Sequence, residues 1–259
     1  MRRILGFGVA AIMAATVTLL LLNLEPQFSR EDGGWLSAVG QTRGDIDVDD
    51  IDRAVQAEGS ELMALLKQEL PAEYAQMLAD LAEMVRGGAD PDEIYRHSAD
   101  ATARIRRDGA SIVAGAPDPA LIEVLDTART LLVAVREQYG KETCARFAAR
   151  GPAIFDRRQI APLNEPMDRH GTAMLRAIAR ARAEETPRFP ANHSDQEALR
   201  SAFLAAGGTD EDLQKIAAND NTDAAACARL DLLMRTSTEI PGARGARLRA
   251  MMVSALAGS

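Results

Sequence analysis

The sequence predicts an all-α protein in which an N-terminal single transmembrane helix precedes a multi-helix extracytoplasmic bundle. Three observations support this fold class. First, the 259 residues include 48 alanines, the strongest helix former, and only 4% aromatic residues, which strands favour. Second, an uncharged apolar run opens the chain. Third, apolar residues farther along recur every three or four positions between recognisable helix ends, as in amphipathic helices.

Residues 1–24 predict a signal anchor. Arg2 and Arg3 precede an apolar run, residues 4–22, which at ~1.5 Å per residue covers nearly the ~30 Å hydrocarbon core of a bilayer. The apolar region of a signal peptide is usually shorter and ends at small residues, whereas this run ends in leucines before Glu25. We therefore favour an uncleaved transmembrane helix. A cleaved signal, which would release a secreted or periplasmic protein, is the alternative.

The flanking charges predict the orientation of this helix. Arg2, Arg3 and the amino terminus stay in the cytoplasm, and acidic residues follow the span, so the rest of the chain is expected outside the cytoplasm. Arginine outnumbers lysine 27 to 3, and alanine and arginine have GC-rich codons, which favours a GC-rich bacterium as the source. We therefore expect a single-pass protein of the bacterial inner membrane with a periplasmic C-terminal domain.

Residues 25–48 predict an acidic flexible linker, since they contain Pro26, several glycines and scattered charges without sustained periodicity. The net charge of −8 is unevenly spread: residues 25–52 carry −6, and the much longer segment 53–259 carries only −4. The chain has no strong basic stripe, so nucleic acid is not an expected partner.

Residues 49–259 predict one α-helical domain. An N-cap residue or a proline in the first turn marks a helix start, and glycine after the last turn marks a stop. These signals place starts at Ser60, Pro71, Asp90-Pro91 and Asp118-Pro119, and a stop at Gly87-Gly88. The clearest apolar stripe follows the last of these starts and consists of Leu121, Leu125, Ala128, Leu132, Val135 and Tyr139.

The second half of this domain contains two proline-rich segments, 151–166 and 186–193, and each is a candidate boundary between two lobes. The helix between them is apolar around Leu175. Further helices are expected at the capping box Ser194-x-x-Glu197, at Thr209, around Cys227 and around Leu248. The last helix carries Arg244, Arg247 and Arg249. We expect it to dock on the domain, and contact with anionic lipid is the alternative.

Cys144 and Cys227 are the only cysteines, and each lies one turn before an apolar helix residue. In an exported protein an even pair favours a disulfide. The bond would close a loop of about 80 residues, which the chain-entropy description equates with ~4 kcal/mol of stability. The alternative is two buried thiols that pack as small apolar residues.

No catalytic, cofactor-binding or metal-binding residue is predicted. The acidic stretch 45–50 resembles the start of a calcium loop, but the loop lacks its turn glycine and its bidentate glutamate. We interpret this stretch as the approach to a helix N-terminus, where acids are stabilising. The three histidines, His97, His170 and His193, lack metal-motif spacing and are expected at the surface or at helix ends.

These features predict a membrane-anchored extracytoplasmic helical protein of unknown biochemical activity, with a non-catalytic binding or scaffolding role. An envelope enzyme, whose catalytic acids or histidines converge only in the fold, is the alternative. The expected partners are the membrane, through the N-terminal helix, and either another envelope protein or a second copy. Gly6, Ala10 and Ala14 form a small-xxx-small pattern on one face of the membrane helix, which permits close helix–helix approach.

Overall fold

The structure, a computed structural model, describes residues 46–57, 59–155, 157–184, 186–218 and 220–258. Every regular element in these residues is helical, which confirms the all-α class. In chain order the elements are α4 (Val48–Ala57), α5 (Glu61–Glu69), α6 (Pro71–Arg86), α7 (Pro91–Gly109), η2 (Val113–Gly115), α8 (Asp118–Arg150), η3 (Gly151–Ile154), α9 (Arg157–Ile160), η4 (Ala161–Leu163), α10 (Asn164–Glu184), α11 (His193–Ala205), α12 (Asp210–Ala217), α13 (Ala226–Glu239) and α14 (Gly242–Gly258).

The predicted transmembrane helix and nearly all of the predicted linker lie outside the described residues, and with them Gly6, Ala10 and Ala14. None of the helices in the described part of the chain combines the length and the apolarity needed to cross a bilayer. The acids around the end of the predicted linker lie at a helix start, as expected. At the beginning of α4, Asp47 Oδ1 accepts the amide of Asp50 (2.9 Å) and Asp50 Oδ2 accepts the amide of Asp47 (3.1 Å).

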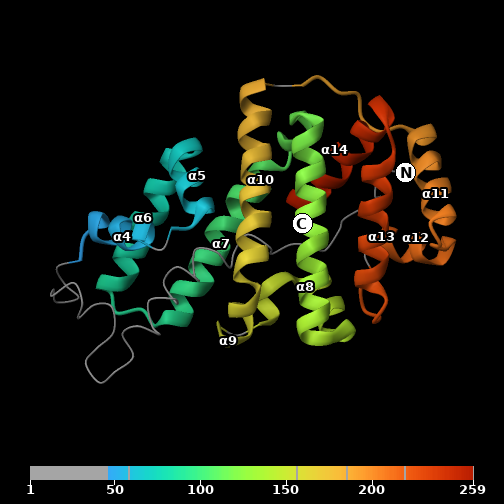
Figure 1. Cartoon of the computed structure of the whole chain (residues 1–259). Coiled ribbons are helices and arrows are strands. Elements are labelled where there is room, and N and C mark those ends of the chain that lie inside the picture. Colours follow the sequence, from blue (N-terminus) through green and yellow to red (C-terminus); the bar gives the residue numbers. More distant parts are fainter. Residues whose placement is uncertain (1–45, 58, 156, 185, 219, 259) are drawn as a thin grey trace.

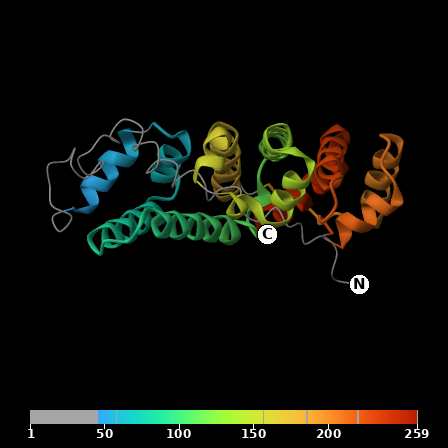
Figure 2. The ribbon, with the colours of Figure 1, turned by 90° about the horizontal axis from the view of Figure 1, so that it is seen from below.

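Three long helices form the middle of the molecule. α10, α8 and α13 stand side by side with α8 in the centre, and α14 passes behind α8 (Figure 1). Seen from below, the three lie in one row, with α4 to α6 beyond α10 and with α11 and α12 beyond α13 (Figure 2). Helix α7 contacts α6, α10 and α14, so it joins the N-terminal helices to the centre.

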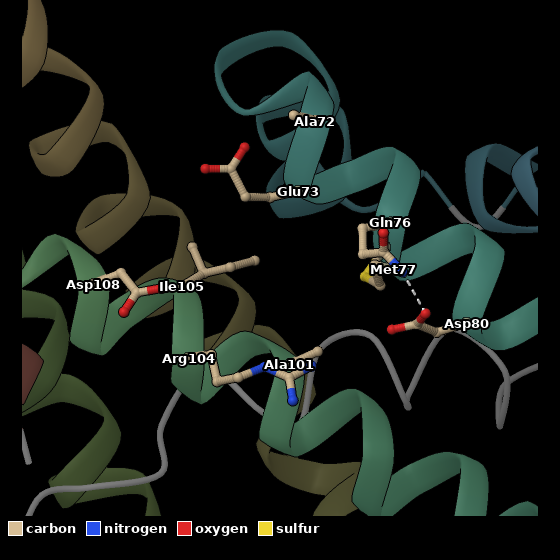
Figure 3. Close-up of a pocket in the computed structure, with 9 residues that line it drawn as sticks. All are labelled: Ala72, Glu73, Gln76, Met77, Asp80, Ala101, Arg104, Ile105 and Asp108. Carbon is tan, nitrogen blue, oxygen red and sulfur yellow. Dashed lines mark hydrogen bonds between the residues drawn. The ribbon is translucent and has the colours of Figure 1, made fainter.

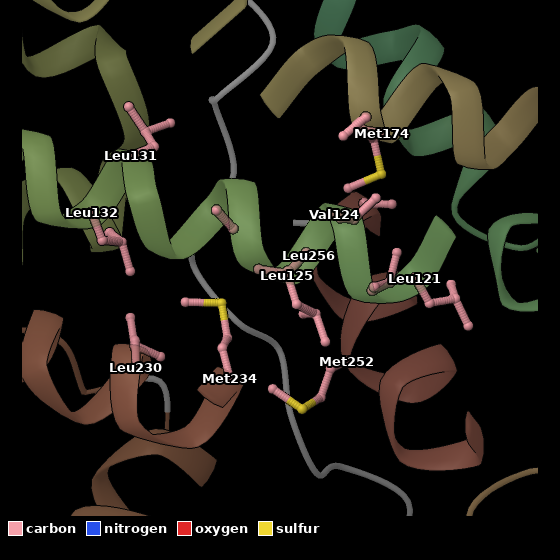
Figure 4. Packing of buried hydrophobic residues seen from close by; sticks show 14 of the residues in the cluster. Leu121, Val124, Leu125, Leu131, Leu132, Met174, Leu230, Met234, Met252 and Leu256 are labelled. Carbon is pink, nitrogen blue, oxygen red and sulfur yellow. The ribbon is translucent and has the colours of Figure 1, made fainter. Parts of the chain in front are cut away.

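The larger apolar cluster surrounds α8 and is filled by side chains of α10, α13 and α14 (Figure 4). Leucine, alanine and methionine supply most of it, and fully burying each large side chain contributes ~1.5–3 kcal/mol. The predicted stripe of α8 is buried from Leu121 to Val135, and Tyr139 packs on the cluster from a half-buried position. Because few aromatic rings are present, flexible methionines such as Met174 and Met252 fill the gaps between helices.

A second, smaller cluster lies among α4, α5 and α6. It contains residues between Ile46 and Val85 and one residue of the central helices, Leu175 on α10. The segments 151–166 and 186–193 both belong to the part of the chain that builds the larger cluster. The domain boundaries inferred from the sequence stay a prediction, and limited proteolysis tests them.

Several helix starts follow the predicted signals. α6 begins at Pro71. The side chain of Asp90 accepts the amide of Glu93 in a capping box at the start of α7, and Thr209 caps α12 in the same way. Local sequence therefore suffices to fix these three helix ends.

The predicted capping box at Ser194 is wrong. Asn192 is the N-cap of α11, and Asp195 is its reciprocal partner three residues on. Asp195 is also bound by Arg247 of α14, whose Nε and Nη2 donate to the two carboxylate oxygens at 2.8 and 2.7 Å. These bonds, and then the amide of Asn192, hold the pKa of Asp195 well below its usual range. The carboxylate that completes the Asn192 capping box thus also receives a contact from a distant helix.

Helix α8 is kinked near its end, which the sequence did not predict. Gly140 has a φ of 80°, a left-handed conformation that glycine adopts without steric cost. The kink falls directly after Tyr139, whose hydroxyl donates to the carbonyl of Gln159. Beyond it, the last turns of α8 bring Cys144 into the core.

Cys144 on α8 and Cys227 on α13 form the predicted pair. Their Cα atoms lie 6.0 Å apart, within the range for a disulfide, and both residues are buried. The bond joins two central helices that also pack through their apolar faces.

Candidate functional site

An open groove runs along α6 and α7, and Figure 3 shows the residues that line the first part of it. Two adjoining hollows of about 320 and 540 Å³ form it, and Asp80 lines both. We call this surface the α6–α7 groove. Its walls are Glu73, Gln76, Asp80 and Glu83 on α6 and Glu93, His97, Ala101, Arg104 and Asp108 on α7.

The groove follows from how the two helices are joined. Its wall residues recur every three or four positions on each helix, so they share one face of α6 and one face of α7. Gly88, with a φ of 77°, and the cap at Asp90 reverse the chain between the helices. Glu73 therefore shares the first hollow with Asp108. The groove follows the length of α6, which at ~1.5 Å per residue is about 24 Å.

The floor of the first hollow is apolar. Met77 on α6 and Ala101 on α7 are buried, and Ile105 is half-buried and packs on the smaller cluster. Figure 3 shows Ile105 extending from α7 into the space beside α6. The first hollow thus offers an apolar surface that an incoming side chain can cover.

Acidic side chains dominate the rims. Asp80 Oδ1 accepts the side-chain amide of Gln76 (2.6 Å), and its Oδ2 lies 3.3 Å from Nε2 of His97. Arg182 at the end of α10 reaches to 3.9 Å from Glu73. The Gln76 and Arg182 contacts are solvent-exposed, and the His97 contact is partly buried. Exposed contacts of this kind contribute little to stability and can be exchanged for contacts with a ligand.

Buried charges elsewhere serve the fold. Arg249, 2% exposed on α14, donates to both carboxylate oxygens of Asp118 at 2.8 and 2.6 Å. Its Nη1 also donates to the carbonyls of Ser237 (2.8 Å) and Ile240 (2.9 Å) at the end of α13. One guanidinium therefore satisfies carbonyls that a helix end leaves unpaired and fixes the start of α8.

Arg106 on α7 has a comparable role. It is 1% exposed, and its Nη1 donates to the carbonyls of Leu256 (2.6 Å) and Ala257 (2.9 Å) in the last turn of α14. Burial, and to a smaller extent the charge of Arg107, lowers the pKa of Arg106 to about 10, so it remains a cation at neutral pH. A cation at a helix C-terminus is stabilised by the helix dipole.

His170 is buried in α10, so its expected position at the surface or at a helix end is wrong. It is 2% exposed, and its Nδ1 lies 3.1 Å from Oγ1 of Thr127 on α8. Burial, followed by the nearby charge of Arg106, lowers the pKa of His170 to about 4. The imidazole is therefore neutral at pH 7 and acts as a polar link between two central helices.

The ends of α12 and α13 are held by a further ion pair. Arg229 is buried, and its Nη1 donates to both carboxylate oxygens of Asp223 at 2.7 and 2.9 Å. This bond is the main cause of the lowered pKa of Asp223, about 2. Arg229 Nη2 also donates to the carbonyl of Asp220 (3.1 Å), so the pair fixes the loop before α13.

Of the histidines, the cysteines and the last-helix arginines singled out in the sequence, His97 lines the groove and the others lie elsewhere. The arginines of the last helix are used internally, which confirms that α14 docks on the domain: Arg244 and Arg247 reach Asp195, and Arg249 reaches Asp118. Across the described residues, no three histidine, cysteine or acidic side chains gather as a metal site would require.

A second exposed feature lies on the turn between α10 and α11. Phe189 is 86% exposed and stands between two prolines. The turn is held against η2, since the amide of Thr186 donates to the carbonyl of Gly115 (2.9 Å) and Arg188 Nη1 donates to the carbonyls of Ala114 and Ala116. Phe189 is thus presented on an anchored turn, and no groove accompanies it among the described hollows.

No family model matches this chain, and comparisons with curated proteins and with solved structures likewise found no match.

Sequence reasoning missed the groove, although part of the signal is present. Glu73, Gln76, Asp80 and Glu83 can be read as a polar stripe on a predicted helix. Such a stripe is normally a solvated face. The stripe on α6 becomes one wall of a groove because a second stripe, on α7, lies opposite it. Only the packing of the two helices brings the two stripes together.

Proposed function

We propose that this protein is a membrane-tethered, extracytoplasmic binding or scaffolding module, and that the α6–α7 groove binds a protein partner. The observation that carries the proposal is the groove: it is open, its floor is apolar and its rim carries exposed charges. Concave surfaces with an apolar floor and a few polar groups are typical of binding sites. The buried guanidinium groups of Arg106 on α7 and Arg249 on α14, by contrast, are engaged with helix ends.

Two features support the proposed location of the domain outside the cytoplasm. The apolar run 4–22 behind Arg2 and Arg3 favours an anchor with the domain outside the cytoplasm. The buried Cys144–Cys227 pair favours an oxidising compartment, where disulfides persist. A topology reporter fused after Gly40 should be active in the periplasm, and activity in the cytoplasm would contradict this location.

The alternative, an envelope enzyme, has one specific observation in its favour. His97 Nε2 lies 3.3 Å from Asp80 in the groove, as in a general base held by a carboxylate. No serine, threonine or cysteine is among the described residues that line the two hollows, so this pair has no side-chain nucleophile to activate. We therefore favour binding over catalysis.

Site-specific photocross-linking in native membranes tests the binding site. A photoreactive residue at the exposed position Gln76 should give a discrete protein adduct, and one at Gln138 on α8 should not. Ala72→Trp, which fills the groove, should abolish the adduct. Ala75→Trp, at an exposed position of the same helix outside the groove, should leave it intact. Equal labelling from Gln76 and Gln138, or an adduct that survives Ala72→Trp, would contradict the proposal.

A further inference from the structure

We infer that the ligand of the α6–α7 groove is a cationic, amphipathic protein segment, with lysine or arginine on one side and apolar side chains on the other. This inference rests on the proposed function, because it specifies the chemistry of the partner at the same site. Three features of the groove support it: the charge of its rims, the nature of its floor and its length.

The rims carry an excess of negative charge. In the described part of the chain, five carboxylates line the two hollows, on Glu73, Asp80, Glu83, Glu93 and Asp108. Among the described wall residues, Arg104 and His97 are basic, and Arg182 of α10 lies 3.9 Å from Glu73, so the acids still outnumber the basic groups near them. In a concave surface the potentials of like charges add, so the groove attracts cations and repels anionic lipid and nucleic acid.

The floor requires apolar side chains in the ligand. Met77 and Ala101 are buried beneath the first hollow, and Ile105 contributes apolar surface to its side. A purely hydrophilic cation would leave this surface in water, whereas leucine or phenylalanine side chains would cover it. A methionine in the floor also adapts to side chains of different shape.

The length of the groove fits a helix. At ~1.5 Å per residue, α6 and a partner helix of about 16 residues are both about 24 Å long. The α6 acids are seven residues apart from Glu73 to Asp80 and three apart from Asp80 to Glu83. Cationic residues at helical spacing on the partner would meet them, while the apolar face of the partner lies on the floor.

A titration of the full-length protein with defined peptides tests this chemistry. The protein is held in micelles of an uncharged detergent, and the anisotropy of a labelled helical peptide of about 16 residues reports binding. The first peptide carries lysines on one face and leucines on the other. In the second, glutamates replace the lysines, and in the third, serines replace the leucines. The first should bind at least about 10-fold more tightly than either of the others.

Matched variants of the protein assign the effect to the groove. The triple variant Glu73→Gln, Glu83→Gln, Asp108→Asn should weaken binding of the first peptide roughly 10-fold, since it removes three exposed ion pairs. A control triple, Glu137→Gln, Glu142→Gln, Glu239→Gln, makes the same change in net charge at exposed positions away from the groove. It should change binding less than about 2-fold. Circular dichroism checks that both variants keep the helical fold.

Each other outcome overturns the inference. If the glutamate peptide binds as tightly as the first peptide, the ligand need not be cationic, and if the serine peptide does, it need not be amphipathic. If both triple variants weaken binding equally, the peptide does not bind at the groove. Self-association that the groove triple abolishes would assign the groove to a second copy. A groove adduct with an acidic segment in native membranes would overturn the inference but leave the proposed function standing. The absence of any groove-dependent adduct would contradict both the inference and the proposed function.

Discussion

Replacing His170 by asparagine should remove a pH-dependent part of the stability of the folded domain. The imidazole is buried between α10 and α8, with Nδ1 3.1 Å from the hydroxyl of Thr127. The asparagine amide can occupy the position of Nδ1 and does not titrate. The variant loses ring volume at every pH, so the informative quantity is the change in its stability with pH relative to the wild type.

The size of this pH-dependent change in stability follows from the pKa of His170. Burial, together with the charge of Arg106, lowers the pKa of His170 from its ordinary value of 6.5 to about 4 in the folded protein. Above the unfolded pKa both states hold a neutral imidazole, and the contribution is fully present. As the pH falls from 6.5 toward 4, the unfolded chain binds a proton that the folded protein does not, so the free energy of unfolding decreases. The loss reaches ~1.4 kcal/mol per pH unit and ~3 kcal/mol in total.

Urea unfolding of the full-length protein in detergent, at several values between about pH 7 and about pH 4.5, measures this effect. Helix content by circular dichroism is the appropriate signal, because the only tryptophan, Trp35, lies outside the described residues. The difference in free energy between wild type and His170→Asn should shrink as the pH falls. His193→Asn, at an exposed position, controls for the removal of a histidine. Parallel loss of stability in wild type and His170→Asn would refute the reasoning.

Three further changes test the packing of the central helices, each by denaturant unfolding. Replacing Cys144 and Cys227 together by serine should lower the free energy of unfolding by ~4 kcal/mol, since the bond closes a loop with a sequence separation of 83. An unchanged unfolding midpoint, or a wild-type mass that reductant does not alter, would count against the bond. Replacing Arg249 by methionine leaves a carboxylate and two helix-end carbonyls without their donor and should cost about 3 kcal/mol; a loss below about 1 kcal/mol would contradict its role. Gly245→Ala would place a Cβ 1.8 Å from a backbone carbonyl oxygen and should destabilise the fold by about 2 kcal/mol or more. Gly115→Ala, whose Cβ would have its nearest atoms at 4.0 Å, should be close to neutral, and equal effects of the two variants would refute the steric argument.

Local signals predict part of this fold, because several of its helix starts are marked by adjacent residues. Pro71, the cap at Asp90 and the cap at Thr209 act within one turn, and the structure uses all three. The cap of α11 was mispredicted because Asn192-x-x-Asp195 and Ser194-x-x-Glu197 are overlapping capping patterns. The structure uses the first, and Arg247 on α14 binds its Asp195. Periodicity cannot report a contact between residues that lie 52 positions apart.

The candidate site was beyond sequence reasoning for the same reason. The polar stripe on α6 is visible in the sequence, but a solvated face and one wall of a groove have the same pattern. The buried position of His170 was also hidden, since the residue that it contacts, Thr127, lies 43 positions earlier on another helix. By contrast, the pairing of Cys144 with Cys227 could be predicted, because only two cysteines are present.

Hydrogen–deuterium exchange of the full-length protein, with and without the lysine–leucine peptide, tests the central claim most directly. If the α6–α7 groove is the binding site, bound peptide should slow amide exchange within α6 and α7 and leave α11 and α12, at the other end of the molecule, unchanged (Figure 1). Protection confined to the turn that carries Phe189, or to α11 and α12, would contradict the account. So would the absence of protection at a peptide concentration that saturates the anisotropy signal.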